Sequence, residues 1–215
     1  SFTIEDMILT AEERYEMKFL AGQNGWANSI SWVHLLEDTT IIQNFWGKEL
    51  AVTTGLGFPK KEDWMHLARQ LNKYHASGLI INVGQYIKDV PEELKSYCDE
   101  NDLPLLTVPW EVHLSDMIKD FSIHVFLQDN TDEQIASALI AAIETPENQK
   151  TYRKELLQHF DVDGSFQVLL LTREGLDSMD TVERRKLSYR RQVYLEDITH
   201  NASFFYYNSD FVLVA

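Results

Sequence analysis

Three short apolar segments, each followed by a turn of polar or aromatic residues, constrain the fold of this chain more than any other feature of its sequence. They occupy residues 48–55, 79–84 and 103–109. Apolar runs of this length, bounded by turn residues, are typical of buried β-strands. They recur about every 27 residues, as the crossover between parallel strands requires, and helical periodicity fills each interval. We therefore predict an α/β domain with a parallel sheet of βαβαβ type.

The intervals between these strands have the pattern of amphipathic helices. In the first interval, one face collects apolar side chains at spacings of three and four, namely Trp64, Leu67, Ala68, Leu71 and Tyr74. In the second, Pro91 followed by two glutamates predicts a helix start. Upstream, Thr3 and Asp6 suit the N-terminal cap of a short helix, and residues 30–35 alternate like a half-buried strand.

The second half of the chain changes its period twice. Residues 115–160 show helical periodicity, and we expect a break at residues 129–131 and a new helix from Thr145 to about His159. From residue 161 onward the pattern predicts a strand, a helix and a β-hairpin that turns at residues 208–209. This order, β-α-β-β, is about half of a ferredoxin-like domain.

We therefore predict three parts: an α/β domain over residues 1–114, a helical connector over 115–160 and a ferredoxin-like segment over 161–215. The apolar faces of the connector leave two interpretations open, because they can seal the domain or pair two copies of the chain. The chain starts at Ser1 and stops within a predicted strand, so we expect a fragment whose last domain is truncated.

Composition limits the classes of function. The net charge is −15 at pH 7, and each of the three parts holds more acidic than basic residues, which argues against an ordinary nucleic-acid-binding surface. One basic cluster, flanked by acidic residues on a predicted helix, consists of Arg184, Arg185, Lys186, Arg190 and Arg191. Cys98 is the single cysteine, which excludes a disulfide framework. No apolar run approaches the ~20 residues of a membrane helix and no signal peptide is recognisable, so we expect a cytoplasmic protein without a membrane partner.

The candidate binding residues lie at the ends of the three predicted strands. They are, in chain order, Thr53, Thr54, Gly55, Gly84, Tyr86, Trp110 and Glu111. Ligands of an open parallel sheet favour the crevice beyond the carboxyl ends of its strands. Hydroxyl groups, a carboxylate and aromatic rings at that edge suit a small polar ring compound, such as a purine or a metabolite derived from one. In the alternative interpretation, the threonines satisfy their own turn and Trp110 fills the core.

Other chemistries find little support in the sequence. Residues 55–61 do not form a phosphate-binding loop, since Pro59 removes an amide donor and no Ser or Thr follows the lysines. His34, close to Glu37 and Asp38, has no second histidine at ligand spacing. We therefore predict no catalytic residue, no metal site and no cofactor, and a protein that is not an enzyme.

Five segments together resemble the purine catabolism regulator (PucR) family of bacterial transcription regulators. They are residues 32–34, 47–55, 78–81, 90–94 and 103–111. Their order and spacing make the resemblance specific over roughly residues 7–120. It implies a sensory domain whose parallel sheet is similar to the N-terminal domains of HPr kinases and Mur ligases.

The same resemblance implies what surrounds this domain. Family members carry a central GGDEF-like domain and a C-terminal helix-turn-helix that binds DNA, and residues 161–215 resemble the start of the former. At the hairpin, Asn208 and Ser209 stand where a diguanylate cyclase has paired glycines, and Phe211 follows Asp210 directly, so the segment is degenerate and cyclase activity is not expected.

Two functions remain open from the sequence. The first is a regulatory fragment that binds a small metabolite, forms a homodimer, and contacts DNA only through a domain absent from this chain. The second is a protein-interaction or oligomerisation module without a small-molecule ligand.

Overall fold

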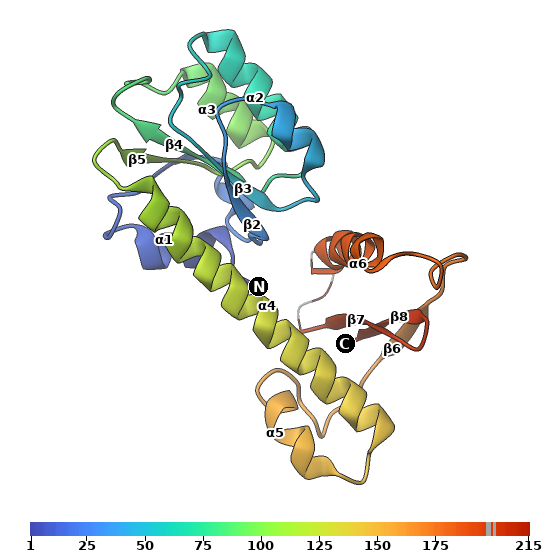
Figure 1. Cartoon of the computed structure of the whole chain (residues 1–215). Helices are drawn as coiled ribbons and strands as arrows, with labels where there is room; N and C mark the ends of the chain where they lie inside the picture. The colour runs from blue at the N-terminus through green and yellow to red at the C-terminus, as the bar shows by residue number, and fades with distance from the viewer. Residues whose placement is uncertain (197–198, 200) are drawn as a thin grey trace. The chain divides into compact units, whose positions relative to one another are not determined.

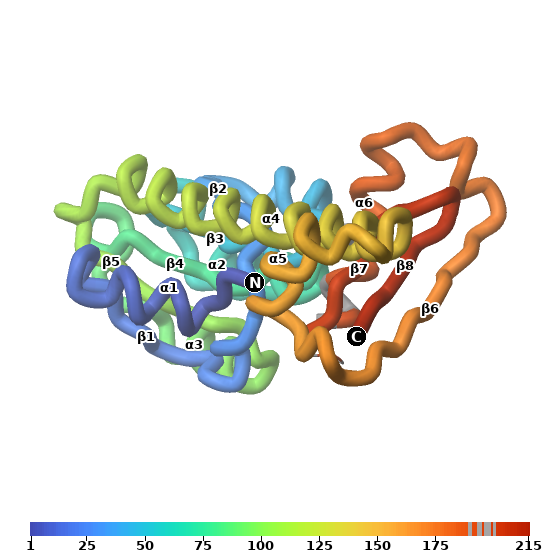
Figure 2. The backbone as a smooth tube through the Cα atoms, turned by 90° about the horizontal axis from the view of Figure 1, so that it is seen from below, coloured from blue at the N-terminus to red at the C-terminus, as the bar shows by residue number. Residues whose placement is uncertain are grey.

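The computed structural model describes residues 1–196, 199 and 201–215. The chain forms two compact units, Ser1–Gln128 and Asp129–Ala215, and the division falls inside the long helix α4 (Leu114–Glu144). The two units are described separately below. Figure 1 labels most of their helices and strands along the chain, and β1 is labelled in Figure 2.

The N-terminal unit is built on a five-stranded sheet with the order β1-β5-β4-β3-β2. Strands β2 to β5 run parallel, whereas β1 pairs with β5 in the antiparallel direction. The strands are β1 (Lys18–Ala21), β2 (Trp32–Leu35), β3 (Glu49–Thr53), β4 (Gly78–Val83) and β5 (Leu105–Pro109). The predicted parallel arrangement of the three central strands is confirmed, and one further strand extends the sheet at each edge.

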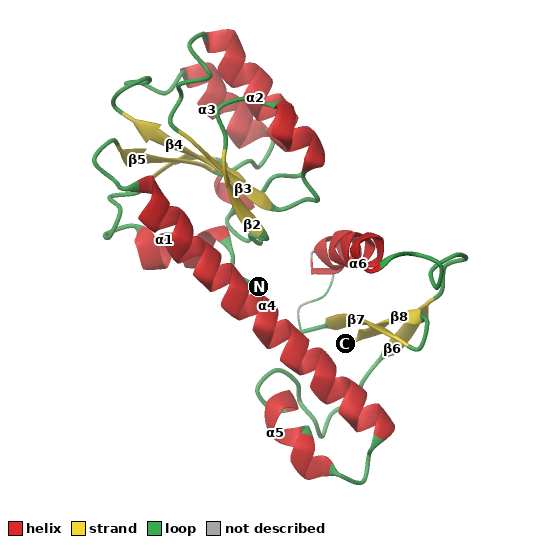
Figure 3. Ribbon diagram, in the orientation of Figure 1, coloured by secondary structure: helices red, strands yellow, loops and turns green. Residues whose placement is uncertain are grey.

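Helices cover both faces of this sheet, as Figure 3 shows. On one face, α2 (Lys61–Lys73) and α3 (Glu92–Glu100) contribute Leu71 and Leu94 to a buried core. On the other face, α1 (Ile4–Ala11) and the first half of α4 contribute Met7 and Phe121. Because both faces are covered, strands rich in Val, Ile and Leu are stable there without alternating polar residues.

Local capping follows the predicted signals in this unit. Thr3 Oγ1 accepts a hydrogen bond from Asp6 N (3.1 Å) and Asp6 Oδ2 accepts one from Thr3 N (3.0 Å), so the predicted capping box of α1 is confirmed. Two short 3₁₀ turns, Gln23–Gly25 and Thr40–Asn44, complete the connections.

The C-terminal unit holds a three-stranded antiparallel sheet with the order β6-β8-β7. The unit begins, after α4, with the 3₁₀ turn η3 (Gln149–Thr151) and the short helix α5 (Arg153–Leu156). The elements that follow have the predicted β-α-β-β order: β6 (Val168–Leu171), α6 (Thr181–Glu196), β7 (Ser203–Tyr207) and β8 (Asp210–Val214). Asn208 (φ 46°) and Ser209 (φ 73°) both adopt the left-handed conformation. Two consecutive residues of this kind form the type I′ turn of a hairpin, so the predicted hairpin is confirmed.

The predicted break at residues 129–131 is wrong. Helix α4 runs without interruption from Leu114 to Glu144, and Figure 2 shows it as one continuous coil. Val125 is buried in the N-terminal unit and Leu139 in the C-terminal unit, so packing anchors the helix on both sides of the weak helix formers. Each such residue costs only about 0.7 kcal/mol or less, which the packed flanks offset.

The predicted helix from Thr145 to His159 is also wrong in extent. Only the turn η3 and the single helical turn α5 form there. Leu156 is buried but Leu157 is exposed, so this segment has no continuous apolar face to hold a longer helix against the unit.

The predicted helix of the basic cluster is present as α6, where Glu183 N donates to Asp180 Oδ1 (2.8 Å) at its start. The side chains of Arg190 and Glu196, and Asp197 altogether, lie outside the described residues. None of the described helices has both the length and the apolar character that crossing a membrane requires.

Candidate functional site

The four parallel strands of the N-terminal unit all end at the same edge of the sheet. The register of their pairing places the loops after β2, β3, β4 and β5 there. These loops, with the first turns of the helices that follow them, are called the strand-end edge below; it comprises residues 36–39, 54–63, 84–93 and 110–116. All seven candidate binding residues lie at this edge or at the last position of β3. This is the position at which open parallel sheets bind ligands.

The carboxylate of Glu37 organises one half of the strand-end edge. Its Oε2 accepts hydrogen bonds from Thr53 Oγ1 (3.0 Å) and from Gly57 N (3.4 Å). Its Oε1 accepts from Thr54 N (2.8 Å) and Thr54 Oγ1 (2.6 Å). Both carboxylate oxygens therefore accept two hydrogen bonds each, and the loop after β2 is tied to the loop after β3.

These contacts change the role of the two threonines. Thr53 is fully buried, and the hydroxyl protons of Thr53 and Thr54 are both directed to Glu37. Thr53 Oγ1 also accepts from Gly55 N (3.1 Å), which closes the turn. The geometry therefore resembles the alternative interpretation, in which the threonines satisfy their own surroundings.

Glu37 was missed as a member of this edge. The sequence alone indicates Glu37 as a neighbour of His34 and Asp38, and not as a partner of Thr53 and Thr54. The alternating segment at residues 30–35 was already recognised as a strand, but its direction was not predicted. Had β2 been treated as a fourth parallel strand, Glu37 would have been placed beside Thr53 and Thr54.

Two aromatic rings occupy the other half of the strand-end edge. Tyr86 and Trp110 meet edge to face, with ring centroids 5.7 Å apart, and the two residues are 48% and 40% exposed. Gly84 (φ 137°) makes this arrangement possible, because a Cβ atom there would lie 2.8 Å from the Cβ of Trp110. Trp110 therefore does not fill the core, and that part of the alternative interpretation is wrong. Both rings offer apolar surface to a planar ligand.

The two halves are connected through the loop after β4. Gly84 N donates to Ile87 O (2.7 Å). Ile87 in turn packs beside Gly55, because a Cβ atom added to Gly55 would lie only 3.2 Å from Ile87 Cγ2. Buried Asn82 donates from Nδ2 to Pro109 O (2.7 Å), which joins the ends of β4 and β5. The loops after β3, β4 and β5 therefore form one contiguous surface.

The loop after β5 leads directly into α4. His113 Nδ1 lies 2.9 Å from Asp116 Oδ2, and Asp116 N donates to His113 O (3.0 Å), so this loop caps the helix. Glu111 is exposed in the same loop. Only four residues, from Trp110 to His113, separate the end of β5 from the first residue of α4. Trp110 is thus separated from the first residue of α4 by only three residues.

Two other residues considered from sequence, His34 and Cys98, have packing roles in the structure. The His34 ring stacks on Phe45 (centroids 5.0 Å apart), and burial lowers the His34 pKa against a smaller opposing effect of Glu49, so it is neutral near pH 7. Cys98 is buried in α3, and burial raises its thiol pKa to about 12, which makes it unreactive at neutral pH.

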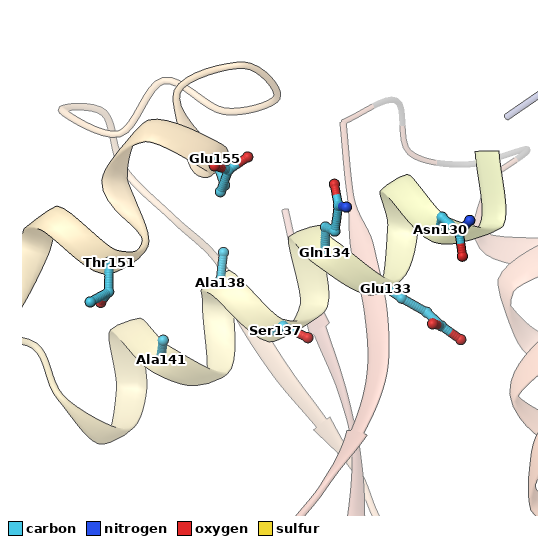
Figure 4. Close-up of a pocket in the computed structure, with 8 residues that line it drawn as sticks. All are labelled: Asn130, Glu133, Gln134, Ser137, Ala138, Ala141, Thr151 and Glu155. Carbon is cyan, nitrogen blue, oxygen red and sulfur yellow. The ribbon is translucent and has the colours of Figure 1, made fainter. Parts of the chain in front are cut away.

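The pockets identified among the described residues lie away from the strand-end edge. The larger, about 630 Å³, belongs to the C-terminal unit and is open to solvent. Figure 4 shows its lining residues, with Ala138 and Ala141 of α4 beside Glu155 and Thr151. The second, about 410 Å³, lies along residues 149–157. Neither of these two pockets includes a candidate binding residue.

The sequence of this chain was compared with those of known proteins and protein families. Purine catabolism regulatory protein of Bacillus subtilis (strain 168) is 24% identical over 123 residues, which are 57% of this chain and 23% of that protein. The chain thus spans about a quarter of the length of this curated relative. The sequence profile of the Purine catabolism regulatory protein-like (PucR) family matches residues 7–125, which include the whole five-stranded sheet and its strand-end edge. Because that match covers more than half of the 215 residues, the chain belongs to the Purine catabolism regulatory protein-like family.

Proposed function

We propose that this chain is the regulatory, non-enzymatic part of a bacterial transcription regulator. Its strand-end edge binds a small purine-related metabolite, such as a free purine or a ureide. DNA is contacted only by another domain of the whole regulator. Membership of the family and the name of the Bacillus relative support the link to purine catabolism.

The convergence of the strand-end loops is the observation that carries this proposal. Four loops meet at the edge where open parallel sheets bind ligands, and two half-exposed aromatic rings lie there. A planar purine stacks on Tyr86 or Trp110, while backbone and side-chain polar groups of the same loops fix its orientation.

Helix α4 transmits the signal in this proposal. Ligand binding displaces Trp110, and the four-residue loop passes the displacement to the first turn of α4. Met117, Phe121 and Val125 then carry it along the sheet, because they hold α4 against the core. Two copies of the chain associate as a homodimer, so the shift acts on both.

Residues 161–215 are proposed to be the start of a degenerate GGDEF-like domain. The order β6-β8-β7, with antiparallel neighbours, supports this, since it is the order of the first half of a ferredoxin-like sheet. The turn formed by Asn208 and Ser209 supports the absence of cyclase activity, because neither residue is a glycine.

A second function is favoured by a different observation. The hydroxyl groups of Thr53 and Thr54 are used by Glu37, and neither described pocket lies at the edge. A surface satisfied by its own side chains suits a protein partner as well as a small ligand. In that case exposed Tyr86 and Trp110 are anchors of a protein interface.

Calorimetric titration of the 215-residue chain with hypoxanthine, guanine and allantoin separates the two functions. We expect measurable heat for at least one compound, and at least about tenfold weaker binding for Trp110→Ala. Trp32→Ala is the matched control, since Trp32 is 48% exposed but begins β2 and so lies at the opposite end of the sheet. Absence of heat for all three compounds would favour the protein-interaction module.

A further inference from the structure

The strand-end edge carries many more acidic than basic residues. Its four segments, residues 36–39, 54–63, 84–93 and 110–116, hold nine acidic residues and three lysines, a difference of −6. Lys61 forms an ion pair with Glu93, which leaves Lys60 and Lys88 as the other cations of these segments. Such a surface raises the local concentration of cations and repels anions.

The helices that begin at this edge carry their own negative charges. The first turns contain Glu62 and Asp63 in α2, Glu92 and Glu93 in α3, and Asp116 in α4. Asp63 Oδ2 accepts from Lys60 N (2.9 Å), so the start of α2 is closed by a side chain of the helix itself. The positive ends of three helix dipoles, which commonly attract phosphate groups, are therefore already complemented.

Glu37, in the loop after β2, adds a further negative charge that faces the loop after β3. The donors of that loop that could cradle an anion are Thr54 N, Gly57 N and the two threonine hydroxyls, and all four donate to Glu37. An incoming phosphate would have to displace a carboxylate that accepts four hydrogen bonds. The chain thus supplies internally the anion that related sheet architectures take from a ligand.

We propose that the strand-end edge selects uncharged ring compounds and rejects their phosphorylated forms. This inference rests on the proposed small-molecule function and specifies its ligand class: a free base, nucleoside or ureide, and not a nucleotide. The aromatic rings of Tyr86 and Trp110 bind the planar ring, while Glu37 and the acidic helix starts exclude a phosphate. The regulator is thereby insensitive to the nucleotide pool.

A matched ligand series tests the proposal on the full 215-residue chain. Hypoxanthine, inosine and inosine monophosphate share one ring and differ by a ribose and then a phosphate. We expect the monophosphate to bind at least about tenfold more weakly than the nucleoside, with a difference that shrinks as salt is raised. The step from hypoxanthine to inosine reports the effect of size, and the salt dependence of the step from nucleoside to monophosphate reports the effect of charge.

Two variants locate the source of the discrimination. Glu37→Gln is expected to reduce the nucleoside-to-monophosphate affinity ratio by about threefold or more, because the central charge is lost. Glu111→Gln removes an exposed charge of the same edge without touching the Glu37 hydrogen bonds, so it remains informative where Glu37→Gln fails to fold. Glu12→Gln, at the C-terminal cap of α1, changes net charge equally and should leave the ratio unchanged.

The outcomes distinguish this inference from the function on which it rests. If the monophosphate binds as tightly as the nucleoside, or more tightly, the proposed selectivity is wrong while small-molecule binding stands. If the ratio in Glu12→Gln falls as far as in the edge variants, the effect is one of net charge and the assignment to this edge is wrong. If neither the series nor allantoin binds, the small-molecule function itself fails and the selectivity with it.

Discussion

The two sheets of this molecule contain similar apolar strands in very different surroundings. In the N-terminal unit, every residue of β3 and the first five of β4 are buried. In the C-terminal unit, all four residues of β6, Val-Leu-Leu-Leu, are exposed. The sequence predicts all three segments as strands for the same reason, a short apolar run between turns. The comparison teaches that such a run specifies a strand but not its burial.

The difference has a structural cause. Strands β3 and β4 lie inside their sheet and have helices on both faces. Strand β6 is an edge strand that pairs only with β8 among the described residues. In that unit the buried side chains of α4 pack with Phe205, Val212 and Val214 of β7 and β8. Exposed apolar edge strands are sites at which other chains associate, and β6 presents such an edge.

A matched pair of leucines tests this comparison with the largest expected effect. Leu79→Ala in β4 should cost about 3–5 kcal/mol of unfolding free energy, because Leu79 is fully buried and its removal leaves a cavity. Leu170→Ala in β6 should cost less than about 1 kcal/mol, since Leu170 is 67% exposed.

Tryptophan fluorescence during urea unfolding reports on the first of these variants, because all five tryptophans lie in the N-terminal unit. Hydrogen exchange of peptides from β6 and β8 reports on the second. Equal losses of unfolding free energy for the two leucines would mean that β6 is covered in solution. That result would contradict the difference in burial between the two sheets.

Two glycines give the next largest contrast. A Cβ atom at Gly57 would lie 1.5 Å from the backbone oxygen of Glu37, so Gly57→Ala must separate the two loops and should cost about 2–3 kcal/mol. In the C-terminal unit, a Cβ atom at Gly164 would lie 3.1 Å from Asp161 O, and Gly164→Ala should cost below about 1 kcal/mol. Thermal unfolding measures both. A tolerant Gly57 would show that the Glu37 loop is not fixed as described.

Hydroxyl removal sharpens the comparison further. Thr54→Val leaves Glu37 Oε1 without the 2.6 Å hydrogen bond and should cost about 1–2 kcal/mol. Thr145→Val is its control in the C-terminal unit, where the exposed Thr145 Oγ1 donates to Ala141 O (3.0 Å) and the cost should be about 0.5 kcal/mol. Urea titrations of both variants supply the values. Should Thr54→Val prove neutral, the threonine hydroxyl is available to a ligand after all.

The smallest expected effect concerns alkaline pH. Burial raises the Cys98 pKa from 9.0 to about 12, so the folded state holds this proton more tightly than the unfolded state. The stabilisation from this group is fully present below pH 9 and is lost as the pH rises toward 12. At pH 10 about 1 kcal/mol of the free energy of unfolding has been lost. The C-terminal unit has no cysteine and should lack this term. The measurement is the difference between wild type and Cys98→Ala at pH 7 and pH 10; a difference that does not change with pH contradicts the assignment.

Much of the N-terminal sheet was predictable from sequence, and the candidate site was predictable in part. Thr53, Gly84 and Trp110 were placed at one edge because parallel strands must end together. The contact of Glu37 with Thr53 and Thr54 was not predictable, because it depends on the direction and register of β2. The antiparallel pairing of β1 was missed for the same reason, since local pattern does not encode strand order.

The sequence by itself determined the strands β2 to β8, the crossover helices α2 and α3, the cap of α1, the turn at Asn208 and Ser209, and membership of the family. Each of these depends on residues close together in the chain or on a pattern of spacing. Only the tertiary structure decided that α4 continues through residues 129–131, that β6 is exposed, and that Glu37 uses both threonine hydroxyls. Those outcomes depend on which distant segments pack together, and packing free energies of several kcal/mol outweigh local propensities of less than about 1 kcal/mol per residue.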